Sequence, residues 1–238
     1  MIKDVIAKYI AVWYKKLTSS YIREVTGMEL THLTINFLGD SITEGYGVND
    51  VKNCFVSRIA AETGCICRNY GISGTRIARQ KKASVYPMHD LDFVARVPCM
   101  GEDADLIVVF GGTNDFGHGD APLGCMDDRD VFTFYGALHT LYSSLKARYS
   151  GKPIVVITPL QRARPLEKSI VPALSDYVDI IKQVAAFYDL PVLDLFQQSR
   201  LHPRTEQLRE RYLPDGLHPN DEGHAILASE ILTFLQAL

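Results

Sequence analysis

A serine follows closely after a glycine that ends an apolar run near the start of the chain. The run Leu33–Leu38 leads into Gly39, Asp40 and Ser41. If a helix begins here, its free N–H groups and its dipole favour negative charge on Ser41, which suits an alkoxide nucleophile. The alternative is that Asp40 or Ser41 only caps that helix. The segment taken alone does not separate the two interpretations.

A nucleophilic serine requires a base, and the base requires a carboxylate that orients it. The segment Asp215–His218 supplies an aspartate and a histidine three residues apart, with Gly216 between them. This spacing lets both side chains reach one side of a turn, where they would complete a triad with Ser41. The alternative is an ordinary turn at Asp215 and Gly216, with His218 on a surface loop.

Two glycine-containing segments offer hydrogen-bond donors for the oxyanion of a tetrahedral intermediate. Gly111 and Gly112 precede Asn114, whose side-chain amide can donate to developing negative charge. Gly74 lets the backbone approach a substrate closely and offers its own N–H group. Each segment by itself also fits a simple turn, because asparagine and glycine are common turn residues.

Short apolar runs alternate with helical patterns along the chain. The predicted strands are Leu33–Leu38, Cys65–Tyr70, Asp105–Phe110, Pro153–Thr158 and Pro191–Leu195. The predicted helices are Val51–Thr63, Phe132–Tyr149, Ile170–Tyr188 and Glu222–Leu238, the last capped by Asn220 or Asp221. The third and fourth strands are almost continuously apolar, as in strands buried on both faces of a parallel sheet. This alternation predicts an α/β sandwich with one parallel sheet.

The candidate site residues all follow a predicted strand or lie in the last loop. In open α/β sheets, ligands bind outside the carboxyl ends of parallel strands, which meet at the same edge. We therefore expect one edge of the sheet to bring together Ser41, Gly74, Asn114, Asp215 and His218. This joint placement favours the catalytic interpretation of all four segments.

The four segments resemble, in order along the chain, the sequence blocks of the SGNH or GDSL-type hydrolase family. The matching residues are Gly39–Thr43 (GDSIT), Gly74, Gly112–Asp115 (GTND) and Asp215–His218 (DGLH). The similarity extends from about Leu33 to the C-terminus, and the first, third and last blocks together are specific to the family. Apolar residues at helical spacing also predict a helix from Ile2 to about Arg23, and this helix lies outside the family pattern.

The resemblance implies a flavodoxin-like three-layer α/β/α sandwich with a five-stranded parallel sheet. It also implies no metal and no organic cofactor. In such an enzyme Ser41 attacks an ester carbonyl, His218 takes the serine proton and Asp215 holds the imidazole tautomer. The Ser41 N–H, the Gly74 N–H and the Asn114 amide then stabilise the oxyanion, and water cleaves the acyl-enzyme.

We expect a carboxylic ester hydrolase that acts on small acyl esters, with O-acetyl groups on a carbohydrate as its substrate. The loop Gly111–Gly124 is polar and rich in glycine, and no long apolar lid segment suits a fatty chain. Within the family, a lysophospholipase or a thioesterase is the alternative. A catalytically silent carbohydrate-binding protein on the same fold is a further alternative. The complete set of site residues argues against it, because a protein without catalytic activity could lose any of them. A protein whose main role is assembly through its N-terminal helix is another.

Four further side chains stay open between substrate contact and a surface role. His89, His118, Arg162 and Arg164 lie in segments that follow predicted strands. The two arginines come after the fourth strand and would suit an anionic substrate, with solvated loop charges as the alternative. No HxH or HExxH cluster is present, so we expect no metal site.

Other polar residues near the predicted site are expected to be structural. Asp40 and Asp115 would fix loops by accepting hydrogen bonds, and His224 would cap or pack the last helix. Ser73 is a poor nucleophile candidate, because only one residue separates it from Gly71 and the segment is therefore not a GxSxG elbow.

The overall composition excludes several classes of protein. The chain has 238 residues, 22% charged residues and a formal net charge of −3, which fit a globular protein and give no electrostatic case for nucleic-acid binding. We expect no stable membrane insertion and a cytoplasmic location, because no long apolar run or secretory signal is visible. The five cysteines do not form CxxC pairs, and Cys65 and Cys67 are expected on one face as small buried residues.

We divide the chain into an amphipathic helical extension at residues 1–27 and a single hydrolase domain at residues 28–238. Apolar residues recur at helical spacing in the extension, at Ile2, Val5, Ile6, Tyr9, Ile10, Trp13 and Leu17. We expect this helix to pack on the core. The alternatives are a homo-oligomer contact and a membrane-surface anchor.

Overall fold

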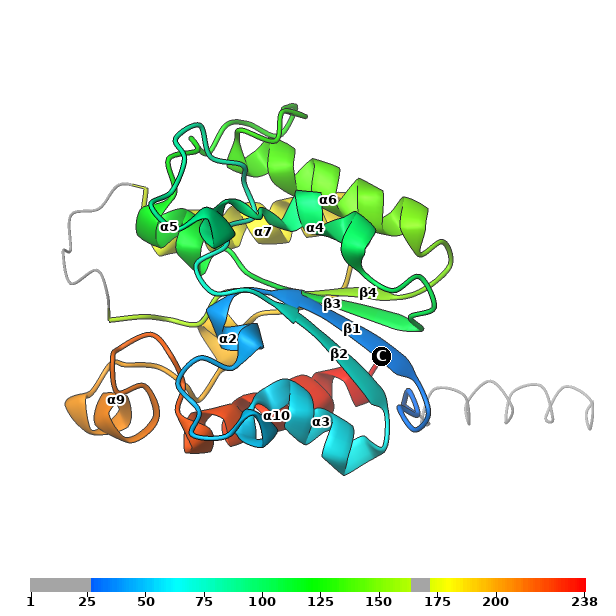
Figure 1. The fold of residues 1–238 in the computed structure, drawn as a ribbon, viewed down its shortest axis with the longest axis vertical. Helices are drawn as coiled ribbons and strands as arrows, with labels where there is room; N and C mark the ends of the chain where they lie inside the picture. Colours follow the sequence, from blue (N-terminus) through cyan, green and yellow to red (C-terminus); the bar gives the residue numbers. More distant parts are fainter. Residues whose placement is uncertain (1–26, 164–171) are drawn as a thin grey trace, which may run out of the picture.

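The computed structural model describes residues 27–163 and 172–238, and its centre is a five-stranded parallel sheet (Figure 1). The strands are β1 (Thr34–Gly39), β2 (Ile66–Gly71), β3 (Leu106–Phe110), β4 (Ile154–Ile157) and β5 (Val192–Leu193). Their order across the sheet is β2-β1-β3-β4-β5, and every neighbouring pair is parallel. The strand order reverses direction at β1, so the crevice at the carboxyl ends of β1 and β3 is the expected place for a ligand.

Helices cover both faces of the sheet and complete three layers (Figure 1). One face carries α3 (Phe55–Thr63) and α10 (Asp221–Gln236), and the other carries α4 (Phe93–Arg96), α6 (Phe134–Arg148) and α7 (Leu174–Phe187). The shorter elements are α2 (Ser41–Glu44), α5 (Thr113–His118), α8 (Leu195–Gln198), α9 (Glu206–Tyr212), η1 (Val51–Asn53), η2 (Pro87–Asp90) and η3 (Val97–Cys99). The expected α/β/α sandwich is therefore confirmed.

Strand β3 shows how the sequence produces two cores. Successive side chains of a strand point to opposite faces of the sheet. Leu106, Val108 and Phe110 accordingly pack in the core beside α3 and α10. Ile107 and Val109 pack in the core beside α4, α6 and α7. Because both faces are covered, the strand has to be apolar at every position, as its sequence is.

Several element boundaries differ from the sequence-based expectations. The helix predicted at Val51–Thr63 is divided into η1 and α3, because Cys54 between them has extended backbone angles (φ −59°, ψ 142°). The fifth strand is shorter than predicted, since the Asp194 carboxylate accepts from the Gln197 N–H and starts α8 at Leu195. Helix α9 was not predicted at all.

The N-terminal extension and the start of the predicted helix at Ile170 lie outside the described residues. The proposed division of the chain at residue 27 therefore stays a prediction. Within residues 27–163 and 172–238, no helix combines the length and the apolar character needed to cross a bilayer.

Candidate active site

Ser41 is the first residue of α2, directly after the carboxyl end of β1. The Asp40 carboxylate caps this short helix by accepting from the Ile42 N–H at 3.1 Å. Ser41 itself makes no such cap, so its hydroxyl is available for another partner. The sequence left open whether Asp40 or Ser41 caps this helix, and in the structure the cap is Asp40.

The Ser41 hydroxyl lies against a histidine that is 177 positions away in the sequence. Its Oγ is 3.0 Å from His218 Nε2, and His218 Nδ1 is 2.6 Å from Asp215 Oδ2. A carboxylate only accepts hydrogen bonds, so Nδ1 carries the proton and Nε2 accepts from the serine hydroxyl. The expected convergence of these three side chains is thus present in the structure.

The turn that carries Asp215 and His218 holds its own geometry. Asp215 Oδ1 accepts from the backbone N–H groups of Leu217, at 2.9 Å, and His218, at 2.7 Å. Partial burial alone would raise the Asp215 pKa, but the hydrogen bonds from His218 and Leu217 outweigh it, and the pKa is lowered. Asp215 is therefore ionised at neutral pH. The ring of Tyr46 lies over the imidazole of His218, with centroids 4.4 Å apart.

Gly74 and Asn114 lie on neighbouring segments at the same edge. Asn114 Nδ2 donates one hydrogen bond to the Thr75 carbonyl at 3.0 Å, which fixes the amide and leaves its second N–H without an acceptor in the described part of the chain. Gly74 has a positive φ of 74°, and a Cβ at this position would overlap the ring of His89. Only glycine fits here, and the oxyanion-donor candidates predicted from the sequence lie side by side.

Asp115 ties the Gly74 segment to the end of β3. Its carboxylate accepts from the N–H groups of Ile77, at 2.9 Å, and Ala78, at 2.8 Å. Asp115 and Asp40 therefore both act as the loop-fixing acceptors that were predicted. Burial raises the pKa of Asp115 to about 6 and that of Asp40 to about 7, in each case against the effect of the backbone hydrogen bonds they accept.

Arg96 is a positioning residue that the sequence did not reveal. Its buried guanidinium donates to the carbonyls of Tyr70, at 2.5 Å, and Gly39, at 3.0 Å, and to Thr75 Oγ1 at 3.0 Å. It thereby joins the ends of β1 and β2 to the residue that follows Gly74. Burial lowers its pKa to about 10, so it remains charged at neutral pH. Nothing in the local sequence VARVP marks this arginine as buried.

The four side chains left open by the sequence have different positions. His89 packs on Gly74, with its ring 5.9 Å from that of His118. His118 Nδ1 accepts from Arg76 at 3.1 Å, and burial together with the charge of Arg76 lowers the His118 pKa to about 4. Arg162 contacts the first residue of α5, whereas Arg164 lies outside the described residues.

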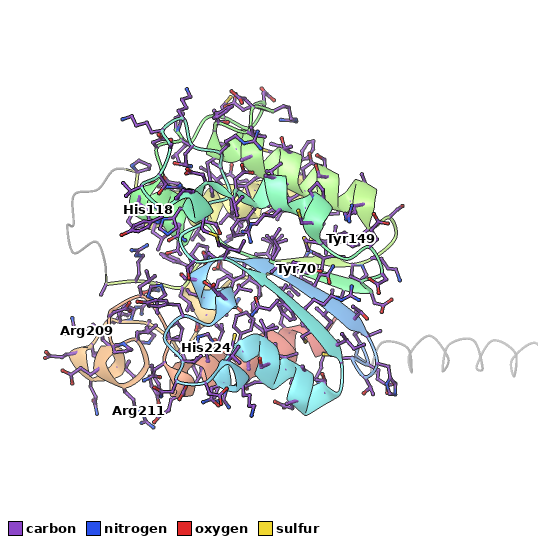
Figure 2. The ribbon with its side chains drawn as sticks, viewed as in Figure 1. Tyr70, His118, Tyr149, Arg209, Arg211 and His224 are labelled. Carbon is purple, nitrogen blue, oxygen red and sulfur yellow. The ribbon has the colours of Figure 1, made fainter. Side chains whose placement is uncertain are left out.

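Two other predicted structural roles can be compared with the structure. His224 is buried in the layer of α3 and α10, far from His118 in Figure 2, where its Nδ1 accepts from the Phe55 N–H at 3.2 Å. This is the predicted packing role. Cys65 and Cys67 share a face, with sulfurs 3.2 Å apart, but only Cys65 is fully buried. No cluster of metal-ligating side chains occurs within the described ranges.

The arrangement has the parts required for acyl transfer. A hydroxyl contacts an imidazole, the imidazole contacts a carboxylate, and two other segments with N–H donors lie at the same edge of the sheet. Acyl transfer needs a nucleophile, a base, an orienting group and an oxyanion site, and these groups have the chemistry and the contacts that those four roles require.

Comparison with known proteins identifies relatives of this chain. Residues 37–226 match the GDSL-like Lipase/Acylhydrolase family. A solved structure of a protein from Lactobacillus plantarum is 31% identical, covers 86% of this chain and 97% of its own, and superposes with a TM-score of 0.74. The lipase/acylhydrolase from Enterococcus faecalis is 24% identical, with coverages of 86% and 95% and a TM-score of 0.60. A search of curated proteins gives no match.

Proposed function

Because the chain belongs to the GDSL-like lipase/acylhydrolase family, it is an ester-cleaving hydrolase, and we propose that Ser41 is its nucleophile. In this proposal His218 is the general base and Asp215 orients it. The observation that carries the proposal is the continuous contact from Ser41 Oγ to His218 Nε2, at 3.0 Å, and from His218 Nδ1 to Asp215 Oδ2, at 2.6 Å. These distances allow proton transfer without rearrangement.

Acylation begins when Ser41 Oγ attacks the ester carbonyl carbon and His218 Nε2 takes the hydroxyl proton. The carbonyl oxygen becomes an oxyanion, which accepts from the N–H groups of Ser41 and Gly74 and from Asn114 Nδ2. The bond to the alcohol oxygen then breaks, and His218 returns the proton to that oxygen. Asp215 stabilises the imidazolium that exists between the two transfers.

Deacylation repeats the same steps with water as the nucleophile. His218 takes a proton from the water, the hydroxide attacks the acyl carbon, and the oxyanion forms at the same donors. The bond to Ser41 Oγ breaks, His218 returns the proton to Oγ, and the carboxylic acid leaves. The free serine is regenerated, and the cycle uses no group beyond those in the chain and water.

We propose short acyl groups as substrates, in particular O-acetyl groups on a carbohydrate. The surroundings of Gly74 are polar, since the ring of His89 packs on it, His118 lies beside His89, and Arg76 donates to His118. Three hollows on the described surface, of about 370, 520 and 530 Å³, are lined by residues such as Leu193, Lys152 and Glu102 respectively, and not by Ser41 or His218.

A series of p-nitrophenyl esters from acetate to palmitate tests this proposal. We expect kcat/KM to be highest for acetate and to fall steadily as the acyl chain lengthens. An optimum at long chains would favour a lysophospholipase instead, and faster cleavage of matched thioesters would favour a thioesterase. Absence of turnover on every ester by the folded protein would overturn the esterase proposal itself.

A further inference from the structure

Arg162 lies between two parts of the proposed active site. It follows β4 in the chain, and its Nη1 donates to the carbonyl of Thr113, at 2.9 Å, and to Thr113 Oγ1, at 3.0 Å. Thr113 immediately precedes Asn114. The next residue, Ala163, donates its N–H to the Gly216 carbonyl at 2.8 Å, inside the turn that carries Asp215 and His218.

The guanidinium is held in a defined position. It lies over the ring of Phe116, with Cζ 5.6 Å from the ring centroid, which is a cation–π distance. A Cβ at Gly117 would come within 2.8 Å of Nη1, so the glycine makes room for the arginine. The two hydrogen bonds to Thr113 complete the support. An arginine that is fixed before a ligand arrives loses little conformational entropy on binding.

Arg162 and Arg76 differ in whether a carboxylate neutralises their charge. Arg76 forms an ion pair with Asp90 at 3.1 Å, whereas no carboxylate of the described residues forms an ion pair with Arg162. Its two hydrogen bonds to described residues both use Nη1, and Nε is buried. Nη2 is not buried and makes no hydrogen bond to the described residues, so its donors can reach a ligand. A half-buried guanidinium with unused donors has the geometry to bind a carboxylate.

Burial lowers the pKa of Arg162, and the more distant carboxylates of Asp40 and Asp215 oppose this effect. The guanidinium remains protonated at neutral pH, as arginine does in proteins. The hydrogen bond from the Ala163 N–H to the Gly216 carbonyl places this segment beside the turn that carries Asp215 and His218. His218 must reach the leaving oxygen to protonate it, so the alcohol part of the substrate lies on this side.

We propose that Arg162 determines specificity by binding a carboxylate on the alcohol part of the ester. The substrate class is then an acylated hydroxy acid, including an acylated sugar that bears a carboxylate. This inference rests on the proposed function, since it takes Ser41 and His218 as the reacting groups. The inference adds that the enzyme selects a negatively charged leaving alcohol, because neither the triad nor the oxyanion donors distinguish charged from neutral alcohols.

Two phenyl acetates that differ only in this charge test the inference. They are 4-acetoxybenzoate and its neutral methyl ester, so the acyl group and the ring are the same. The methyl ester has the better leaving group, and intrinsic reactivity therefore works against the expected preference. We expect the protein to have the higher kcat/KM for 4-acetoxybenzoate, mainly through KM, and to lose this preference as the salt concentration rises.

Substitution of the arginine should change the ratio of the two rates. In Arg162→Gln, we expect the ratio of kcat/KM, charged over neutral, to fall roughly tenfold to a hundredfold, as for loss of a charged hydrogen bond. Arg162→Lys keeps the charge but not the planar fork, so its ratio should be intermediate. The matched control is Arg209→Gln on α9 (Figure 2), which also removes one positive charge from the surface and should leave the ratio unchanged.

The outcomes separate the inference from the function on which it rests. If the folded protein cleaves neither phenyl acetate, the proposed function fails. If it cleaves the neutral ester as well as the charged one, or if Arg162→Gln lowers both rates equally, only the inference is overturned. Should the variants not fold, inhibition of the wild-type protein decides: 4-hydroxybenzoate must compete with the neutral ester better than methyl 4-hydroxybenzoate does, and equal inhibition would overturn the inference.

Discussion

Strand β3 has an aspartate near each end, and the two carboxylates have opposite surroundings. Before the strand, Asp105 is partly exposed, accepts from the Thr34 N–H at 3.1 Å and pairs with Lys152 at 2.9 Å. After the strand, Asp115 is buried and accepts from the N–H groups of Ile77 and Ala78. The hydrogen bond from Thr34 lowers the pKa of Asp105, whereas burial raises that of Asp115 to about 6.

The different surroundings of Asp105 and Asp115 show that one end of the strand favours stability and the other favours the site. At the amino end of the sheet, Asp105 is in contact with water and with a cation, so its charge has little effect on the free energy of unfolding. The carboxyl end buries a carboxylate, which opposes folding at neutral pH. The buried Asp115 carboxylate, however, fixes the backbone of the segment after Gly74. Functional sites commonly contain such groups, which lower the stability of the fold but hold the site rigid.

The largest predicted effect is on the pH dependence of stability. A carboxyl whose pKa rises from about 4 unfolded to about 6 folded keeps its proton longer in the folded state. The free energy of unfolding therefore falls as pH rises between these values. We expect wild type to lose roughly 3 kcal/mol relative to Asp115→Asn between pH 4 and 7. Urea titrations of both proteins across this range measure the difference, and a flat or rising difference would contradict it.

Asp105→Asn is the matched control at the other end of the strand. Its wild-type pKa is lowered on folding, so its contribution is present at neutral pH and is lost as pH falls through the folded pKa. The same titrations should give a difference of opposite sign and below about 1 kcal/mol, because the group is partly exposed and solvent screens its charge. Equal behaviour of the two variants would remove the contrast between the two ends.

A smaller effect is expected on turnover. In Asp115→Asn one side-chain oxygen becomes an NH₂ group, so one of the N–H groups of Ile77 and Ala78 loses its acceptor. The Gly74 segment should shift slightly, and kcat for p-nitrophenyl acetate should fall about tenfold with little change in KM. Asp105→Asn should retain wild-type kcat. Unchanged kcat in Asp115→Asn would show that this carboxylate does not position the oxyanion donors.

Much of the fold could be predicted because the apolar runs are long and unambiguous. Strands β3 and β4 are apolar at every position, and both were found within one or two residues of their predicted bounds. The ends of elements were harder to predict, since single side chains decide them. The carboxylates of Asp50 and Asp194 start η1 and α8 by accepting nearby N–H groups, whereas Asp105 and Asp128 also accept backbone N–H groups and start no helix.

The site could be predicted where its residues have a sequence motif. Ser41, Asn114, Asp215 and His218 are marked by neighbouring glycines at the ends of predicted elements. Arg96 was not predictable, because its function depends on carbonyl groups at the ends of two strands. Arg162 was visible as a charge after a strand, but its support from Thr113, and the absence of an ion pair with any carboxylate that the structure describes, are properties of the folded chain.

Covalent labelling of the serine tests the central proposal most directly. Ser73 is the natural control, since it lies near the site but hydrogen-bonds to the Glu44 carboxylate instead of a histidine. The protein, Ser41→Ala and Ser73→Ala are incubated with a fluorophosphonate, digested and examined by peptide mass spectrometry. We predict one adduct, on Ser41, in wild type and in Ser73→Ala, and none in Ser41→Ala. An adduct on another serine that persists in Ser41→Ala would contradict the assignment of the nucleophile.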